Sequence, residues 1–282
     1  MSIVLITDSA ADYTAAERNE KNIITVPLTV FVNEEAYLDG YSIDAEKFYE
    51  KLSSGDCYPR TSQPSPDLFL EQFLKVKENG DSAICITISS ALSGTFQSAM
   101  IAKDMAEYEN IYVVDSMLVA PAQRLLVDHA KELIDSGMEF KAIIEELEQY
   151  KSRVRIYAMV DTLEYLKKGG RLTFAEAAIG ELVNIKPIIT ITPEGKLTSV
   201  GKALGRSRGY KALIKKIEEN PANKNLPLLL LYSNDEKNCL DFKKKLVSAF
   251  PDQKLADFMV NVGPTVGSHT GPNIVGITYI AE

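Results

Sequence analysis

Short apolar runs alternate with amphipathic stretches from residue 83 to residue 160, and this alternation constrains the fold more than any other feature. Three runs have the length and β-branched content of buried strands: residues 83–88, 111–114 and 154–160. Apolar residues at helical spacing fill the intervals: residues 93–108, 118–134 and 140–150. Because parallel strands need crossover connections of this length, the pattern predicts a parallel sheet covered by helices.

The parts of the chain that flank this central segment are expected to add further strands. Residues 3–7 read as a strand before the central segment, and residues 23–32 read as one or two strands, interrupted by Pro27. Thr173 is expected to cap a short helix after that segment. Later strands are expected at residues 185–191, 197–202, 228–232, 254–260 and 274–280, the first two joined as a hairpin. We therefore predict a two-domain α/β protein. Residues 1–160 form an N-terminal domain with a parallel sheet and crossover helices, and residues 161–282 form a C-terminal domain with a mixed sheet.

Charge and cysteine content narrow the class of protein. The net charge of −8 argues against general nucleic-acid binding, because that function needs a basic surface. No basic leader and no apolar run of membrane-spanning length is visible. Three widely spaced cysteines, Cys57, Cys85 and Cys239, do not suggest a disulfide framework, so we expect a reducing compartment, the cytoplasm. With two histidines and no CxxC motif, a histidine-rich metal centre is excluded; a carboxylate site for a hard cation stays open.

Familiar catalytic and nucleotide motifs are missing from the sequence. It contains no GxxxxGK[ST] loop, no GxGxxG after a strand and no GxSxG nucleophile elbow. We therefore expect that the chain does not bind ATP by itself.

Hydroxyl-rich segments follow three of the predicted strands. They begin at Asp8-Ser9, at Ser89-Ser90 and at Asp115-Ser116, and the second continues through Ser93-Gly94-Thr95. The carboxyl ends of parallel strands share one edge of a sheet, where ligands usually bind. Thr61-Ser62, just before a predicted helix, could join them. Hydroxyls and helix amides suit an anionic head group, although each serine or threonine alone could be only a helix cap.

Two further features carry candidate binding residues. His269 lies among prolines and glycines in residues 262–272, which predicts a shaped loop in which its ring can donate to a carboxylate. Residues 196–216 contain seven basic side chains and no acidic one, and Arg171 lies nearby in the basic segment 167–171. This patch is either a phosphate-facing or partner-facing surface, or a solvated helix face.

These motifs together resemble the DegV family. The matching segments follow the family's order along nearly the whole chain: Thr7-Asp8-Ser9 with Asp12, Thr61-Ser62-Gln63-Pro64-Ser65, Ser93-Gly94-Thr95 with Ser98-Ala99, Asp115-Ser116, Leu166-Lys167-Lys168-Gly169-Gly170-Arg171, Asn184-Ile185-Lys186-Pro187-Ile188, Arg206 or Arg208, and His269-Thr270-Gly271-Pro272. Asn273 departs from the pattern, because the family commonly has a second glycine there.

The resemblance implies a lipid-binding function without catalysis. It implies a fatty acid tunnel between the two domains, with Thr61, Ser93 and His269 holding the carboxylate. The neighbouring Ser62, Gly94 and Thr95 would complete that site. It also implies that a separate fatty acid kinase phosphorylates the bound acid to an acyl phosphate for phospholipid metabolism. Arg171 and Arg206 would then face the phosphoryl donor or the kinase. No cofactor and no metal is implied beyond the fatty acid itself.

Two alternatives come from other classes of protein. A serine hydrolase could act on acyl esters through Ser93, His269 and an acid such as Asp8 or Asp115, because such triads are recognised by geometry and not by sequence order. A regulatory domain that binds a small anion or nucleotide could use the same hydroxyl-rich loops.

Overall fold

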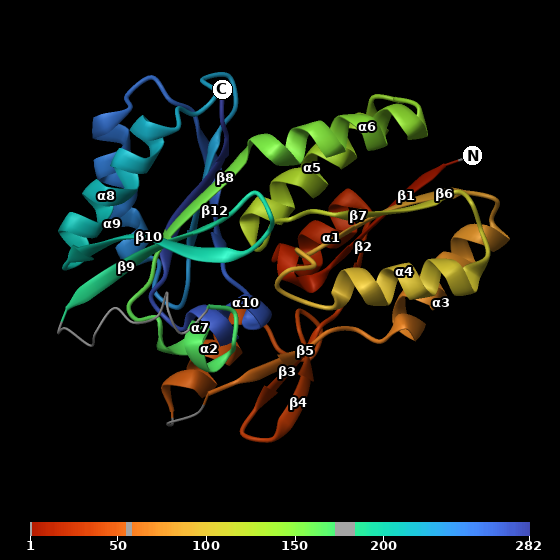
Figure 1. Cartoon of the computed structure of the whole chain (residues 1–282), viewed down its shortest axis with the longest axis horizontal. Helices are drawn as coiled ribbons and strands as arrows, with labels where there is room; N and C mark the ends of the chain where they lie inside the picture. Colours follow the sequence, from red (N-terminus) through yellow and green to blue (C-terminus); the bar gives the residue numbers. More distant parts are fainter. Residues whose placement is uncertain (1, 55–57, 173–183) are drawn as a thin grey trace.

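The computed structural model describes residues 2–54, 58–172 and 184–282. Cys57 and the helix predicted to begin at Thr173 lie outside these residues. Two main layers and a smaller unit below them make up the molecule (Figure 1). None of the described helices has both the length and the apolar character needed to cross a membrane.

The first layer is a four-stranded parallel sheet in the order β2-β1-β6-β7. Its strands are β1 (Ile3–Asp8), β2 (Ile23–Val26), β6 (Ser82–Thr87) and β7 (Ile111–Asp115). Side chains alternate between its two faces, so Leu5 and Ile6 of β1 enter different cores. Helices α3 (Pro66–Glu78) and α4 (Thr95–Ala106) pack on the face of Ile6, and α5 (Pro121–Asp135) packs on the face of Leu5. The predicted parallel sheet with crossover helices is confirmed.

The second layer is a six-stranded mixed sheet in the order β10-β9-β8-β13-β11-β12. Its strands are β8 (Val154–Met159), β9 (Ile185–Ile191), β10 (Leu197–Leu204), β11 (Leu228–Tyr232), β12 (Leu255–Asn261) and β13 (Val275–Ile280). Only β11 and β12 pair in parallel. Helices α8 (Arg206–Glu219) and α9 (Lys237–Ala249) cover one face, whereas the other face shares a core with α5. The predicted mixed sheet is therefore confirmed as well.

Strand β8 does not extend the parallel sheet as its sequence pattern suggested. It pairs antiparallel with both β13 and β9. One face of β8 joins the core under α8 and α9, and the other joins the core between the two layers. That part of the sequence prediction was wrong. The division of the chain at residue 160 stays a prediction.

The smaller unit surrounds a short helix, α10 (Pro264–Thr270). It contains the antiparallel sheet β4-β3-β5 and helix α2, with bounds β3 (Thr29–Val32), β4 (Glu35–Leu38), β5 (Arg60–Ser62) and α2 (Ala45–Ser53). Residues 23–32 therefore form two strands, the second of the two predicted forms, and these strands lie in different sheets on either side of Pro27. Helix α7 (Glu164–Lys168) packs against α10. The remaining elements are α1 (Ala15–Lys21), α6 (Phe140–Tyr150) and the 3₁₀ turns η1 (Ser9–Ala11) and η2 (Lys151–Arg153).

Candidate functional site

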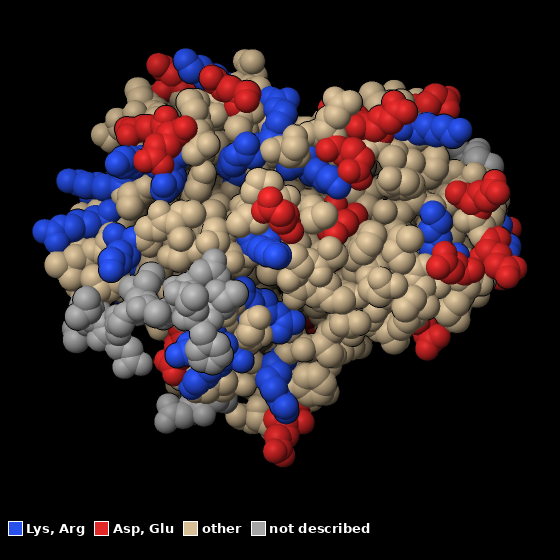
Figure 2. Space-filling model, in the orientation of Figure 1, with Lys and Arg blue, Asp and Glu red and all other residues tan. Residues whose placement is uncertain are grey.

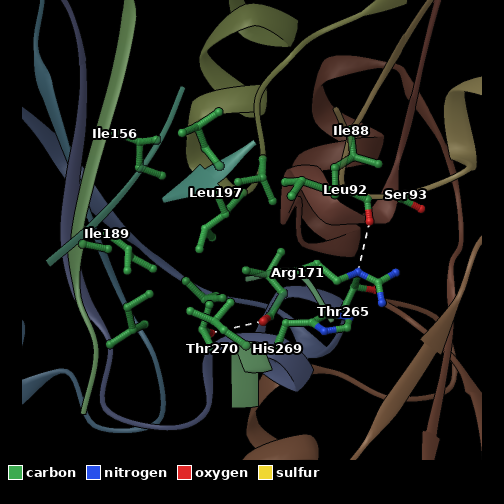
Figure 3. Close-up of a pocket in the computed structure, with 18 of the residues that line it drawn as sticks. Ile88, Leu92, Ser93, Ile156, Arg171, Ile189, Leu197, Thr265, His269 and Thr270 are labelled. Carbon is green, nitrogen blue, oxygen red and sulfur yellow. Dashed lines mark hydrogen bonds between the residues drawn. The ribbon is translucent and has the colours of Figure 1, made fainter. Parts of the chain in front are cut away.

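A cavity lies where the two layers and the smaller unit meet. The space free of protein atoms there is about 770 Å³, part of it open to solvent. Its lining is mainly apolar and comes from both halves of the chain, including Ile88, Leu92, Ile156, Ile189 and Leu197. Figure 3 shows Ser93, Arg171 and His269 at one side of this cavity, and Ile156 and Ile189 at the opposite side.

His269 and Thr61 form the polar end of the cavity. The ring nitrogen Nε2 of His269 lies 2.8 Å from Oγ1 of Thr61, which β5 carries into the site. The other ring nitrogen, Nδ1, is buried without a hydrogen-bond partner among the described residues. Burial, followed by the charge of Arg171, lowers the pKa of His269 to about 4. The imidazole is therefore neutral at neutral pH.

Helix α10 holds His269, although the sequence predicted a shaped loop there. Pro264 occupies the first helical position, where its missing N–H is no loss. The backbone N–H of Gly263 donates to Oδ1 of Asp12 at 3.0 Å, and that of Thr265 donates to Oδ2 of Asp39 at 3.3 Å. These carboxylates, both distant in sequence, satisfy amides at the start of the helix. The loop prediction was wrong because local turn propensity is overridden by these tertiary contacts.

Gly169 makes room for the histidine ring. A Cβ atom at this position would lie 2.2 Å from Nδ1 of His269, closer than real side chains approach. The sequence indicated the glycine pair at residues 169 and 170 only as a helix stop. Gly169 does cap α7, but its hydrogen side chain also allows the close approach to His269. Sequence reasoning missed this second role, since no local signal connects residues 169 and 269.

Arg171 lies beside the same polar end. Its Nε donates to the carbonyl oxygen of Leu92 at 3.1 Å, and its Nη1 donates to that of Gly169 at 2.6 Å. The side chain is half-buried and burial lowers its pKa. Arg171 thus links the loop after β6 to the segment after α7, with its guanidinium close to the cavity (Figure 3).

The serine and threonine candidates do not all reach the cavity. Ser93 lines it, and its Oγ lies 2.9 Å from Oγ1 of Thr95, which is fully buried. Gly94 is the N-terminal cap of α4 between them. Ser62 is exposed on β5 and does not line the cavity. The structure therefore brings together Thr61, Ser93 and His269 but places Ser62 outside the cavity.

Arg206 belongs to a separate polar network at the start of α8. Its Nη2 donates to Oδ1 of Asp161 at 2.8 Å, and its Nη1 donates to the carbonyl oxygen of Asn273 at 3.3 Å. Lys186 pairs with the same Asp161 oxygen at 2.7 Å. Arg206 does not line the cavity. Lysine and arginine side chains spread along the left edge of Figure 2, where α8 and β10 lie in Figure 1. Exposed members of this basic surface are Lys202, Arg208 and Lys211.

The contacts do not assemble the triad of a serine hydrolase. Nε2 of His269 pairs with Thr61, and its Nδ1, which an aspartate would orient in such a triad, has no hydrogen-bond partner in the described part of the chain. Asp8 instead accepts from the backbone N–H groups of Ala10 and Ile88. Asp115 likewise accepts from two backbone amides, those of residues 90 and 117. Neither acid is therefore used to orient the histidine.

Metal ligands do not cluster within residues 2–54, 58–172 and 184–282. No group of three or more His, Cys, Asp or Glu side chains there is placed to hold an ion.

Comparison with known proteins covers the chain from end to end. The family model described as "Uncharacterised protein, DegV family" matches residues 2–282. The chain belongs to the DegV family. Protein DegV of Bacillus subtilis is 33% identical over 287 residues, and the match covers 99% of each chain. The family resemblance drawn from the motifs is thereby confirmed.

Solved structures of DegV family members share this fold. A protein from Thermus thermophilus, whose structure is described as fatty acid binding, gives a TM-score of 0.90 at 30% identity and covers 100% of both chains. A stearic acid-binding protein from Eubacterium ventriosum gives a TM-score of 0.89 at 27% identity, covering 100% of this chain and 98% of its own. Both of these solved proteins are thus described as fatty acid binding.

The DegV motif around His269 contains one difference that the structure explains. Asn273 stands where the family commonly has glycine, and its φ of 65° is a left-handed conformation that asparagine tolerates. Its side-chain Nδ2 donates to Oδ2 of Asp161 at 3.2 Å. Asn273 therefore keeps the turn and adds a contact to the Arg206 network.

Proposed function

We propose that this chain binds one long-chain fatty acid in the cavity between its layers. The carboxylate would lie at the Thr61–His269 end, beside Ser93, and the acyl chain would extend along the apolar wall. The observation that carries the proposal is that His269, its partner Thr61 and the nearby Ser93 and Arg171 lie at one side of a cavity whose lining is mainly apolar. Relatives with this fold are described as fatty acid binding.

A neutral histidine suits a carboxylate that must remain reactive. If Nε2 of His269 carries its proton, it donates to Oγ1 of Thr61, which leaves the Thr61 hydroxyl hydrogen free to point at the ligand. A hydrogen bond to a charged acceptor contributes about 1.5–3 kcal/mol. The carboxylate is thus held by hydroxyl donors without a bidentate ion pair, so an oxygen can still attack a phosphoryl group.

The apolar wall would supply most of the gross affinity. Each buried methylene contributes roughly 0.8 kcal/mol, so about 14 methylenes contribute roughly 11 kcal/mol before costs. Ordering the chain and losing its free motion remove much of this. The head group therefore determines the orientation of the bound fatty acid, and the acyl tail determines most of its affinity.

We further propose that the chain does not catalyse a reaction but presents the acid to a fatty acid kinase in the cytoplasm. Arg171 lies at the polar end, where a phosphoryl group would meet the carboxylate, and arginine can pair with phosphate through its planar fork. Arg206 begins α8, the helix that also carries Arg208 and Lys211 of the basic surface, which an acidic or phosphate-bearing partner would meet. The proposed partners are the fatty acid and the kinase, with no nucleic acid and no stable membrane insertion.

Mass analysis of the protein as purified from cells tests the ligand. We expect one long-chain fatty acid per chain, and stripped protein should take up added palmitate at one equivalent. Ser93→Ala and His269→Ala should weaken this uptake, whereas Ser90→Ala, on an exposed side chain of the same loop, should not. A stripped protein that ignores every added fatty acid would contradict the proposal.

Acyl-phosphate formation with ATP and a fatty acid kinase tests the second part. Arg171→Ala and Arg206→Ala should keep the lipid but lose phosphorylation, and Lys75→Ala, on an exposed lysine of α3 outside the basic surface, is the control. Full phosphorylation by both variants would mean that neither arginine serves the kinase step. Loss of lipid in Arg171→Ala would instead make this residue part of the binding site.

A further inference from the structure

The hairpin of β9 and β10 forms one wall of the cavity. Ile191 and Leu197 face each other in register across this hairpin, and both line the cavity. Both side chains are only partly buried, unlike Ile189, which is 4% exposed in the sheet core. In Figure 3 the Leu197 side chain points into the cavity between the Ile189 side and the Leu92 side.

The tip of this hairpin is fastened to the N-terminal layer. The buried hydroxyl of Ser89 donates to the carbonyl oxygen of Gly195 at 2.8 Å. Gly195 has a φ of 74°, and a Cβ atom there would lie 2.1 Å from the Ser89 oxygen and 3.1 Å from Sδ of Met117. The tip therefore touches the N-terminal loops directly (Figure 1), and Leu197 follows Gly195 by two residues in the chain.

From this geometry we propose that Leu197 limits the length of the acyl chain, and that the Ser89–Gly195 contact holds the hairpin at the distance that sets this limit. The inference rests on the proposed fatty acid binding. A carboxylate fixed near His269 directs the tail toward the side of Ile156 and Ile189, and Leu197 projects into the cavity before that side. The hydrogen bonds of Thr61, His269 and Arg171 described above do not involve Leu197, so its size changes the available space without changing those contacts.

Affinities for a series of saturated fatty acids, from laurate to arachidate, test the proposal. Leu197→Ala removes an isopropyl group, which is the space of about two to three methylenes, so the preferred acid should lengthen by about that amount. Leu197→Phe should shorten it. Each methylene gained or excluded is worth about fourfold in affinity, equivalent to roughly 0.8 kcal/mol. Leu204→Ala, on an exposed leucine of the same strand, should leave the profile unchanged.

Opposite shifts in the two Leu197 variants would support the proposal, because a general loss of stability cannot lengthen and shorten the preferred acid in turn. If the dependence of affinity on acyl chain length is unchanged in both variants, the chain-length proposal is wrong. The proposed function would still stand in that case, provided that the wild-type protein binds a fatty acid. Ser89→Ala should broaden the profile, since the hairpin tip loses its hydrogen bond. If the Ser89→Ala variant distinguishes chain lengths as sharply as the wild type does, Ser89 has no part in setting the length limit.

Discussion

Replacing Gly169 with alanine is expected to weaken fatty acid binding without unfolding the protein. The new Cβ atom would lie 2.2 Å from Nδ1 of His269, and ordinary contact begins near 3.4 Å, so the ring must move by 3.4 − 2.2, about 1.2 Å. The bond from His269 to Thr61 is 2.8 Å long, and a hydrogen bond is lost beyond roughly 3.5 Å. The displacement is therefore large enough to break this contact.

The size of the effect follows from the lost head-group contact. A hydrogen bond to a charged acceptor contributes about 1.5–3 kcal/mol, which corresponds to a rise in Kd of about 10- to 150-fold. Folding stability should change little, since Gly169 has φ −74° and ψ −8°, a helical conformation that alanine adopts readily. Titration calorimetry with palmitate measures the affinity, and urea unfolding of the ligand-free protein measures the stability.

The neighbouring glycine provides a matched control. Gly170 has a φ of 69°, and a Cβ atom there would meet nothing within 4 Å. Gly170→Ala should thus lose about 1–2 kcal/mol of stability through backbone strain and keep its affinity. An affinity like that of the wild type in Gly169→Ala would refute the reasoning. Equal losses of affinity in both variants would also refute it, because the effect would then be a loosened turn and not a displaced ring.

Three further outcomes are expected. Thr61→Val keeps the shape of a strand residue but removes the oxygen next to His269, so palmitate affinity should fall about 10-fold or more in calorimetry, and wild-type affinity would count against a head-group role. Phe73→Ala should lower the free energy of unfolding by about 3–5 kcal/mol, because this side chain is fully buried. Leu74→Ala, at 39% exposure, should cost far less, and equal losses in urea unfolding would contradict the packing described. Burial raises the pKa of Asp39 to about 6 from 3.8, so the folded state binds the proton more tightly. Stability should then fall by up to about 3 kcal/mol as pH rises from 4 through 6, and Asp39→Asn should flatten that slope in urea unfolding at each pH.

The parallel sheet and its hydroxyl-rich loops could be predicted from sequence because their determinants are local. Each strand of this sheet is an apolar run, and the direction of the chain fixes the edge at which its loop emerges. The structure joins two of these loops directly, since Asp8 accepts the backbone N–H of Ile88 at 2.7 Å. Similarly, the N–H of Ser90 reaches Asp115 at 3.1 Å.

The placement of β8 and the helical form of α10 could not be predicted in the same way. The sequence of an apolar strand does not show which sheet it joins, and β8 is placed in the second sheet by its pairing with β9 and with β13, the latter more than a hundred residues later. Likewise, α10 depends on the carboxylates of Asp12 and Asp39, which accept hydrogen bonds from backbone amides 251 and 226 residues away in the chain. The contact between Gly169 and His269 is of the same kind. Such features depend on contacts between residues far apart in the chain, and a single sequence does not show which distant residues meet.

Strand β13 occupies an inner position in the second sheet, between β8 and β11, yet it follows every other strand in the chain. During synthesis the parallel sheet of the first layer can form while the remainder is still being translated, because all four of its strands lie within residues 3–115. The six-stranded sheet cannot close until β13 has emerged. His269, six residues before that strand, appears almost as late. From the emergence of β8 until the emergence of β13, the newly made chain therefore carries one finished layer and an incomplete set of strands. Until then its exposed β8 and β11 edges are surfaces that a chaperone would have to shield.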